Sequence, residues 1–300
     1  ASPHDPNPSD NPDYIEREYY VEPMRRFTIH VDDIPGLEDT DVSTQIYVAC
    51  AYGGGEECPG VVAERAMYFN YMGIDGGHAS IGAPSPASTW YLAEGRTAMD
   101  YDTYVLIMNP NPTSTKATVK FLIPADGAGE GRPHQPEPEE PKPEEPEPQP
   151  NDVITMEYLL KPYERYTIPV DSIPGLEMTD VSTIVESCPA EEGAGTGCNP
   201  VVVERAMYFA RGSNGDGHNS LGATRYNEYW LLAEGYTAEQ FDSWVLVQNP
   251  HEFGVKLEAT FMTPQGDPIV KEYAMPSMSR LTIPLDEIEG LEAAEVSTKL

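Results

Sequence analysis

The sequence is poor in basic residues. It holds 18 lysines and arginines against 50 aspartates and glutamates, which gives a formal net charge of -32. This excess of negative charge repels nucleic-acid phosphates and anionic lipid surfaces, so we expect neither as a partner. The charge is compatible with a hydrated cell exterior, with basic proteins and with cations, and calcium is the one candidate ligand. Solubility alone is the plain alternative explanation for the charge.

Long hydrophobic runs are also missing. No stretch approaches the roughly 18 consecutive apolar residues that cross a bilayer, so the sequence predicts no membrane span. A signal peptide is absent as well, because residues 1–13 are polar and rich in proline. We interpret them as a flexible tail that remains after processing. A leader that had been removed would leave no trace here, so this opening does not argue for the cytoplasm.

Cysteine is scarce, and the four present form two pairs: Cys50 with Cys58, and Cys188 with Cys198. Each pair brackets a loop rich in glycine and glutamate. The CxxC spacing and the neighbouring histidines of a metal site are absent, so we predict two disulfides, each worth roughly 2–3 kcal/mol. Disulfides predict an oxidising compartment, outside the cell or at its surface.

Internal repeats are the strongest signal that is present. The sequence VVAERAMYF from Val61 recurs as VVVERAMYF from Val201, and YLAEG from Tyr91 recurs as LLAEG from Leu231, with the same displacement. A third motif, D-x-I-x-G-L-E followed by V-S-T, occurs three times. Its copies begin at Asp32, Asp171 and Asp286.

The repeats place a proline- and glutamate-rich segment inside a unit. In the later copy, FMTP passes through the short turn 265–268 directly into IVKEY. In the earlier copy, the matching FLIP and ITMEY are separated by residues 125–152. We therefore interpret 125–152 as a disordered insertion at the tip of a β-hairpin whose flanking strands still pair.

Each unit contains about seven short segments of strand character, separated by turn signals. This number fits tandem immunoglobulin-like β-sandwich modules, with a barrel or jelly roll as the runner-up. The fold class is therefore all-β, and the stretch IPGLE indicates a turn with a short helical element. The expected strands of the first copy are 16–21, 26–31, 42–50, 61–71, 88–95, 101–109 and 116–124.

The domain boundaries have two readings. In the first, 14–124 is repeat 1, 153–264 is repeat 2 and 265–300 is a partial third repeat. In the second, 1–85 is partial, 86–225 is complete and 226–300 is partial. In both, the sequence given stops at VSTKL, before the expected counterpart of VVVERAMYF. We expect an open-ended array, which is either a fragment of a longer chain or a subunit completed by strand donation from its neighbour.

Charged residues recur at strand positions that face apolar neighbours. On strand alternation, Arg65 needs an anionic partner, for which Glu94 is the candidate, and the same argument pairs Arg205 with Glu234. We interpret these as structural ion pairs that fix strand register. Glu64 and Glu94 could supply the two carboxylates of a glycoside hydrolase, but nothing in the sequence places them face to face. We therefore predict that the protein is not an enzyme and has no catalytic residues.

A glycine-rich motif also recurs, as DGGHASIGA and GDGHNSLGA. Asp75, His78, Asp216 and His218 are candidate metal ligands, although the spacing is not that of an EF-hand. The alternative is that the glycines form turns and that the polar side chains satisfy loop carbonyls.

The motifs W-Y-L-A-E-G, V-V-x-E-R-A-M-Y-F, G-G-H-x-S-x-G-A and I-P-G-L…D-V-S-T resemble the repeats of large secreted bacterial tandem-repeat proteins of unassigned activity. The resemblance covers nearly the whole chain except the N-terminal tail and the insertion. It implies tandem arrays attached to the cell surface or released from it, and it brings no catalytic residues. The chain departs from it at Trp230-Leu231-Leu232, and its third copy stops after VST.

These observations favour an extracellular structural protein, a subunit of a surface fibre, sheath or layer that self-associates head to tail. The alternative is an adhesin or carbohydrate-binding protein whose partners are glycans or cell-envelope components. In that case Trp90, Trp230 and Trp244 would stack on sugars. A glycoside hydrolase is the third hypothesis.

Overall fold

Nearly every regular element of the protein is a strand, as the alternation of apolar and polar residues predicts. The computed structural model describes residues 14–49, 60–124, 153–187, 199–211 and 214–300. The strands in these ranges form antiparallel sheets, accompanied by two short 3-10 turns, η2 (Val31–Asp33) and η3 (Val170–Ser172). The predicted all-β class and sandwich architecture are therefore confirmed, while the number of repeats stays a prediction.

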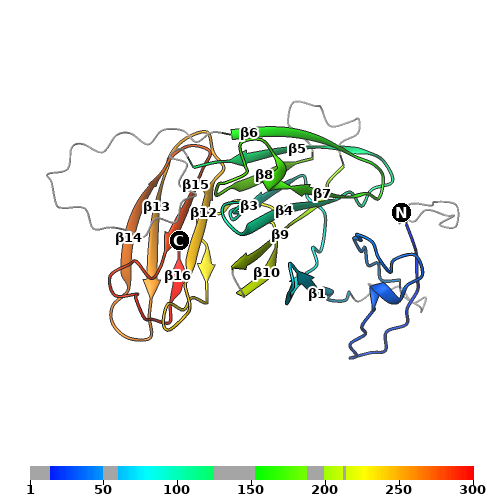
Figure 1. The fold of residues 1–300 in the computed structure, drawn as a ribbon, viewed down its shortest axis with the longest axis horizontal. Helices are drawn as coiled ribbons and strands as arrows, with labels where there is room; N and C mark the ends of the chain where they lie inside the picture. Colours follow the sequence, from blue (N-terminus) through cyan, green and yellow to red (C-terminus); the bar gives the residue numbers. More distant parts are fainter. Residues whose placement is uncertain (1–13, 50–59, 125–152, 188–198, 212–213) are drawn as a thin grey trace, which may run out of the picture.

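Two four-stranded sheets pack face to face in the middle of the molecule and form the central sandwich (Figure 1). One sheet has the order β10-β9-β4-β7, and the other has the order β3-β8-β5-β6. The first contains β4 (Tyr101–Met108), β7 (Arg165–Pro169), β9 (Val202–Arg211) and β10 (Asn214–Leu221). The second contains β3 (Thr89–Leu92), β5 (Thr115–Leu122), β6 (Val153–Leu160) and β8 (Ser182–Glu186).

The core of the central sandwich follows from the period of two along each strand. Val105 and Ile107 of β4 are buried, and so are Val119 and Phe121 of β5, because alternate side chains point to one face of a sheet. Trp90 of β3 joins them and is also buried. Full burial of each large apolar side chain contributes roughly 1.5–3 kcal/mol. The strands of this core lie within 86–225, the complete unit of the second division, and the boundaries themselves stay predictions.

A second, smaller sandwich follows at the C-terminal side (Figure 1). Its sheets have the orders β11-β16-β13-β14 and β12-β15. Val245, Phe261, Ile283 and Leu285 lie in its core. Its strands are β11 (Leu231–Leu232), β12 (Trp244–Asn249), β13 (Val255–Met262), β14 (Ile269–Met275), β15 (Ser279–Pro284) and β16 (Ser297–Lys299).

The two sandwiches share their strand register. Val105 faces Ile168 across β4 and β7, and the matching residues Val245 and Ile283 face each other across β12 and β15. The ladders of β5 and β13 with their neighbours correspond in the same way. Among the described residues, the C-terminal sandwich contains no counterparts of β9 and β10.

The first three expected strands are not present, which corrects the sequence-based prediction. Within 14–49, the segments 16–21, 26–31 and 42–49 run without forming a ladder. Their counterparts β6, β7 and β8 are strands because they pair with β5, β4 and β3. Residues 14–49 join no ladder with the other described strands, and an extended segment outside a sheet is not a stable strand.

The turn at IPGLE forms with or without neighbouring strands, so its structure is encoded locally. Gly36, Gly175 and Gly290 have φ of 95°, 92° and 90°, a backbone region that glycine adopts without steric cost. In each copy the glycine N–H donates to the carboxylate of the glutamate two residues later, at 2.7, 2.8 and 2.9 Å. The predicted turn is confirmed.

The strands that flank the insertion are neighbours, since β5 and β6 pair from Thr115 with Leu160 to Leu122 with Val153. The matching strands β13 and β14 are joined by residues 263–268 alone. We therefore expect that replacing 123–152 by 263–268 preserves the central sandwich. A connection roughly five-fold shorter loses less conformational entropy when its ends are brought together. The free energy of unfolding should therefore rise by about 1.4 kcal/mol.

Denaturant unfolding of the full chain with and without the replacement measures this change. A loss of stability of more than about 1 kcal/mol would mean that the insertion itself contributes contacts to the sandwich.

Candidate functional site

Successive units meet through one ion pair that occurs twice. Arg165 of β7 pairs with Asp41 of the preceding segment, with 2.7 Å between Nη1 and Oδ2. Arg280 of β15 occupies the matching position in the next unit and pairs with Asp180 at 3.0 Å. Both aspartates stand directly before the same Val-Ser-Thr motif. The Asp180 side chain is 14% exposed and that of Asp41 is 79%, so the second pair is the better shielded from water.

Beside these ion pairs, matching positions form an aromatic contact at the first junction and line a cavity at the second. At the first junction, the rings of Tyr14 and Tyr163 lie 5.0 Å apart. The matching residues at the second junction, Val153 and Met278, both line a cavity between the two sandwiches. Gln248 adds a hydrogen bond from its amide to the Ser182 hydroxyl at 3.2 Å. The sequence repeats therefore carry a repeated ion pair at the junction as well as repeated strands.

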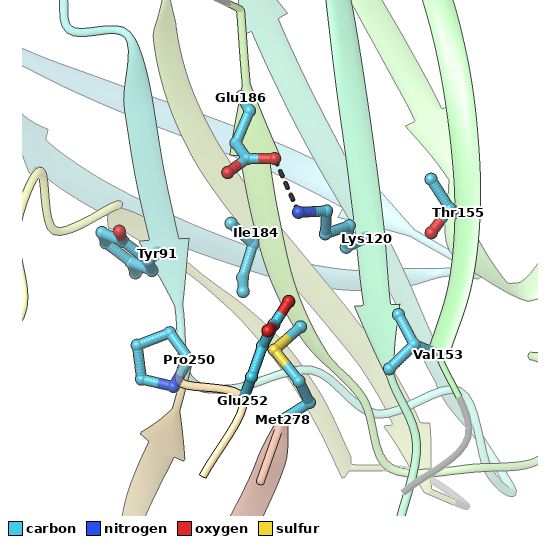
Figure 2. Close-up of a pocket in the computed structure, with 9 residues that line it drawn as sticks. All are labelled: Tyr91, Lys120, Val153, Thr155, Ile184, Glu186, Pro250, Glu252 and Met278. Atoms are coloured by element: carbon cyan, nitrogen blue, oxygen red, sulfur yellow. Dashed lines mark ion pairs between the residues drawn. The ribbon is translucent and has the colours of Figure 1, made fainter. Parts of the chain in front are cut away.

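The cavity at the second junction has a volume of about 400 Å³. Figure 2 shows Lys120 and Glu186 pointing toward each other from neighbouring strands, with 2.8 Å between Nζ and Oε2. The lining consists of Tyr91, Lys120, Val153, Thr155, Ile184, Glu186, Pro250, Glu252 and Met278. The lysine charge is neutralised within the wall, and the described lining contains neither histidine, cysteine nor serine. Besides this ion pair, the cavity presents the carboxylate of Glu252 and the hydroxyls of Tyr91 and Thr155.

A polar cluster lies where the β9–β10 hairpin meets β3. The Arg205 side chain is only 3% exposed and forms a close ion pair with Glu94. The second guanidinium nitrogen of Arg205 lies 3.1 Å from Nδ1 of His218, and Nε2 of that ring lies 3.8 Å from Glu94. Because the guanidinium can only donate, Nδ1 of His218 accepts, and the ring is neutral. Burial is the main cause that lowers the His218 pKa, and the positive charge of Arg205 adds to it.

The ion pairs differ from the expected partners. Arg205 binds Glu94 in place of Glu234, and Arg65 binds Glu204 at 2.9 Å in place of Glu94. The reason is where one sandwich ends and the next begins along the sequence. The central sandwich contains β3, from the first copy of its motif, and β9, from the second copy of the other motif. The arginine of the second copy therefore meets the glutamate of the first. Glu234 is exposed, and no ion pair forms at it among the described residues.

The hairpin of β1 (Glu64–Tyr71) and β2 (Ile74–Ile81) packs on the outer face of the β9–β10 hairpin. Phe69 lies edge-on to the Tyr208 ring at 5.0 Å, and Nε2 of His78 lies 3.4 Å from the Tyr208 hydroxyl. Gly217 permits this approach, because a Cβ there would stand 2.9 Å from the Phe69 ring. The glycine-rich motif therefore forms strands with a close packing face, which the expectation of loops did not include.

The candidate metal ligands do not gather. His78 faces Tyr208, and His218 faces Arg205 and Glu94. Asp75 accepts from the Asn70 amide at 2.8 Å, and Asp216 accepts from the Gly217 N–H at 2.8 Å. No group of three or more histidine, cysteine, aspartate or glutamate side chains that could hold a metal occurs in the described part of the chain. The predicted disulfides at Cys50, Cys58, Cys188 and Cys198 lie outside the described residues.

The two sandwiches differ at one edge. In the central sandwich β4 pairs with β7 on one side and with β9 on the other. Its counterpart β12 pairs with β15, and its other edge has no neighbour among the described strands. Trp90 is 1% exposed and donates from Nε1 to the Val201 carbonyl at 2.8 Å, whereas the matching Trp230 is 40% exposed. Trp244 of β12 is 52% exposed.

Sequence reasoning missed a pair of acidic groups. Asp102 of β4 has a raised pKa, because it is partly buried and because Asp171 lies near it. Asp171 Oδ1 is buried without a hydrogen bond, as is Oδ1 of its counterpart Asp286. Both aspartates stand in motifs that recur, with Asp242 matching Asp102 and Asp286 matching Asp171. That recurrence was the available signal, but sequence alone does not show that the two motifs lie side by side. Neither Asp102 nor Asp171 lines the cavity.

The fold and these contacts define an all-β sandwich protein with a repeated junction. In the described ranges, no helix has the length and apolar character needed to cross a membrane. No protein-family model matches the chain, and no curated protein matches it significantly. Nine chains of solved structures match. One is the crystal structure of Thermotoga maritima 1070, with 14% sequence identity and a TM-score of 0.33, which covers 47% of this chain and 96% of that one.

We expect Glu94→Gln to destabilise the central sandwich by about 3 kcal/mol, because it leaves the buried Arg205 guanidinium without a counter-ion. Denaturant unfolding of the full chain measures the loss. Glu234→Gln, at the matching and exposed position of the C-terminal sandwich, is the control and should change stability by less than about 0.5 kcal/mol. Equal effects of the two variants would show that the Arg205 pair is not a stabilising contact.

Stability should fall as the pH drops below about 6.5. The pKa values of His78 and His218 are lowered from 6.5, mainly by burial, so the unfolded chain binds protons that the folded chain does not. Their contribution is complete above 6.5 and is lost toward the lower folded pKa values. Nearby Glu94 and Asp216 oppose the shift at His218.

The slope of unfolding free energy against pH, between 7.5 and 5.5, measures this loss, and His218→Gln should flatten the slope. The control is His30→Gln, at an exposed position of the N-terminal segment. An unchanged slope in the His218 variant would contradict a buried, neutral ring.

Proposed function

We propose that this chain is an extracellular, non-enzymatic structural protein, a subunit of a surface fibre, sheath or layer that associates head to tail. The observation that carries the proposal is the repeated junction, in which Arg165 meets Asp41 and Arg280 meets Asp180. An interface that recurs at matching positions stacks units along a line, and such arrays extend without new contacts. Figure 1 shows the N-terminal segment, the central sandwich and the C-terminal sandwich following one another along the long axis.

The acidic composition and the cysteine pairs support a location outside the cell. The second cysteine pair falls between β8 and β9, where a disulfide would close the connection between two core strands. A net charge of -32 keeps such arrays hydrated and hinders lateral aggregation. The resemblance to secreted bacterial tandem-repeat proteins points the same way.

The absence of catalysis is part of the proposal. The cavity holds an internally paired lysine, and Asp102, the carboxyl group with the raised pKa, does not line it. A glycoside hydrolase uses two carboxylates across a shared cleft. Glu186 and Glu252 both line the cavity, but Glu186 is neutralised by Lys120. Glu94 is instead engaged by Arg205, and Glu64 is exposed on β1.

An adhesin or carbohydrate-binding protein is the second candidate, and exposed aromatic residues favour it. Trp230, Trp244 and Tyr229 are exposed in the C-terminal sandwich, where rings could stack on sugars. Trp90, however, is buried, and its match to Trp230 indicates a packing position. The unfilled edge of β12 therefore accounts for the exposed tryptophans without a glycan.

Electron microscopy of the native material, with and without a calcium chelator, tests the proposal. We expect rods whose axial repeat corresponds to stacked sandwiches. Rods that survive chelation assign their stability to protein contacts, and rods that dissolve assign it to bound calcium. Dispersed particles under both conditions, together with binding in a glycan screen, would replace the structural role with the adhesin.

A further inference from the structure

The hairpin of β1 and β2 has the same register as the β9–β10 hairpin of the central sandwich. Unlike that hairpin, it belongs to no larger sheet among the described strands. Glu64 faces Ile81 across it, as Glu204 faces Leu221 across β9 and β10. In the central sandwich β9 also pairs with β4, whereas β1 pairs with β2 alone among the described strands.

The apolar side chains of this hairpin match buried ones in the central sandwich. Val201 and Met207 lie in the core beside β4 and β3. The matching Val61 is 54% exposed, and Met67 is 36% exposed. The same side chains that complete one sandwich are thus partly in water in the other hairpin, at a cost of roughly 25 cal/mol for each Å² of apolar surface.

The C-terminal sandwich is the complementary case, since its described strands include no counterpart of the β9–β10 hairpin. Its strand β12 keeps the register that β4 has toward β7, so its open edge presents the same backbone groups that bind β9 in the central sandwich. Trp230 stands where Trp90 is covered by the hairpin, and Glu234 stands where Glu94 binds Arg205. Unpaired sheet edges are templates for another strand.

We propose that the open edge of β12 binds the β1–β2 hairpin of a second copy of this chain, and that this exchange links the copies head to tail. The inference rests on the proposed structural function and names the two surfaces that would carry it. The occupant is a second copy because this chain itself contains a hairpin with the sequence, register and charge that the edge requires.

The central sandwich fixes the geometry of the linked state. Val105 faces Arg205 and Thr103 faces Met207, so Val245 should face Arg65 and Ser243 should face Met67 of the second copy. The Trp230 indole should then donate to the Val61 carbonyl, as Trp90 donates to Val201.

Charge complementarity sets the orientation. Arg65 should pair with Glu234 of the other copy, as Arg205 pairs with Glu94. Within one copy, Arg65 is held by Glu204 and Phe69 rests on Tyr208. The Arg65–Glu204 pair is partly exposed, with side chains 45% and 19% accessible, and exposed pairs of this kind contribute roughly 0–1 kcal/mol. The exchange therefore replaces an exposed ion pair by a buried one, and it also has to release the contacts of Phe69 and Tyr71 with Tyr208.

Sedimentation of the full chain over a range of concentrations tests the exchange. We expect reversible linear association, with Trp230 moving into an apolar environment that shifts the tryptophan emission to shorter wavelength. Met67→Glu places a charge in the new core and should weaken association at least tenfold. Met72→Glu is the matched control, since Met72 lies at the tip of the same hairpin and is 75% exposed, and it should associate as the unchanged chain does.

Charge reversal provides the decisive rescue. Arg65→Glu and Glu234→Arg should each weaken association, and the double variant should restore it, because each copy then offers a carboxylate to the other copy's arginine. A double variant no better than the single ones would overturn the proposal, as would equal association of the two methionine variants.

The outcomes separate this inference from the function on which it rests. Rods that persist in Met67→Glu would reject the hairpin exchange and leave the structural role in place. A chain that stays monomeric while the native material shows no rods would remove both.

Discussion

The ladder between β4 and β9 is the interaction on which the rest of the structure depends. It joins the first half of the central sandwich to the hairpin that follows β8, and it brings Arg205 to Glu94 and the Val201 carbonyl to Trp90. Where the ladder is formed, both faces of the core are closed. Where it is missing, at β12, the same sequence motifs leave Trp230, Trp244 and Glu234 in water.

The ion pairs at the junctions between units are a second and weaker set of contacts. Arg165 with Asp41 and Arg280 with Asp180 hold neighbouring units in matching contacts, and a cavity of about 400 Å³ remains where the second junction packs loosely. Ion pairs of this kind set register more than they set stability. The sandwiches supply the stability, and the junctions determine how one sandwich follows the next.

Much of this fold is predictable from sequence, because its signals are local or repeated. The apolar run of β4 predicts a central strand, and the glycine of IPGLE predicts a turn, each from a short stretch of sequence. The pairing of β5 with β6 follows from comparing the copies. The boundaries of the structural units are not predictable in this way, because they depend on which strands pair with one another. The segment 26–31 alternates as a strand does, yet it joins no ladder, and for the same reason Arg65 binds Glu204 and not Glu94. Alternation records which face is apolar, not which neighbour is present.

Hydrogen exchange of the backbone amides of β12, compared with those of β4 in the dilute, unassociated chain, tests the central claim most directly. In an antiparallel ladder, successive residues direct their amides to opposite neighbours. We predict that every amide of β4 from Tyr104 to Met108 is protected, whereas alternate amides of β12, those directed away from β15, exchange at nearly the rate of an open chain. Uniform protection along β12 would show that its edge is already covered, and the account of an unfinished sandwich would be wrong.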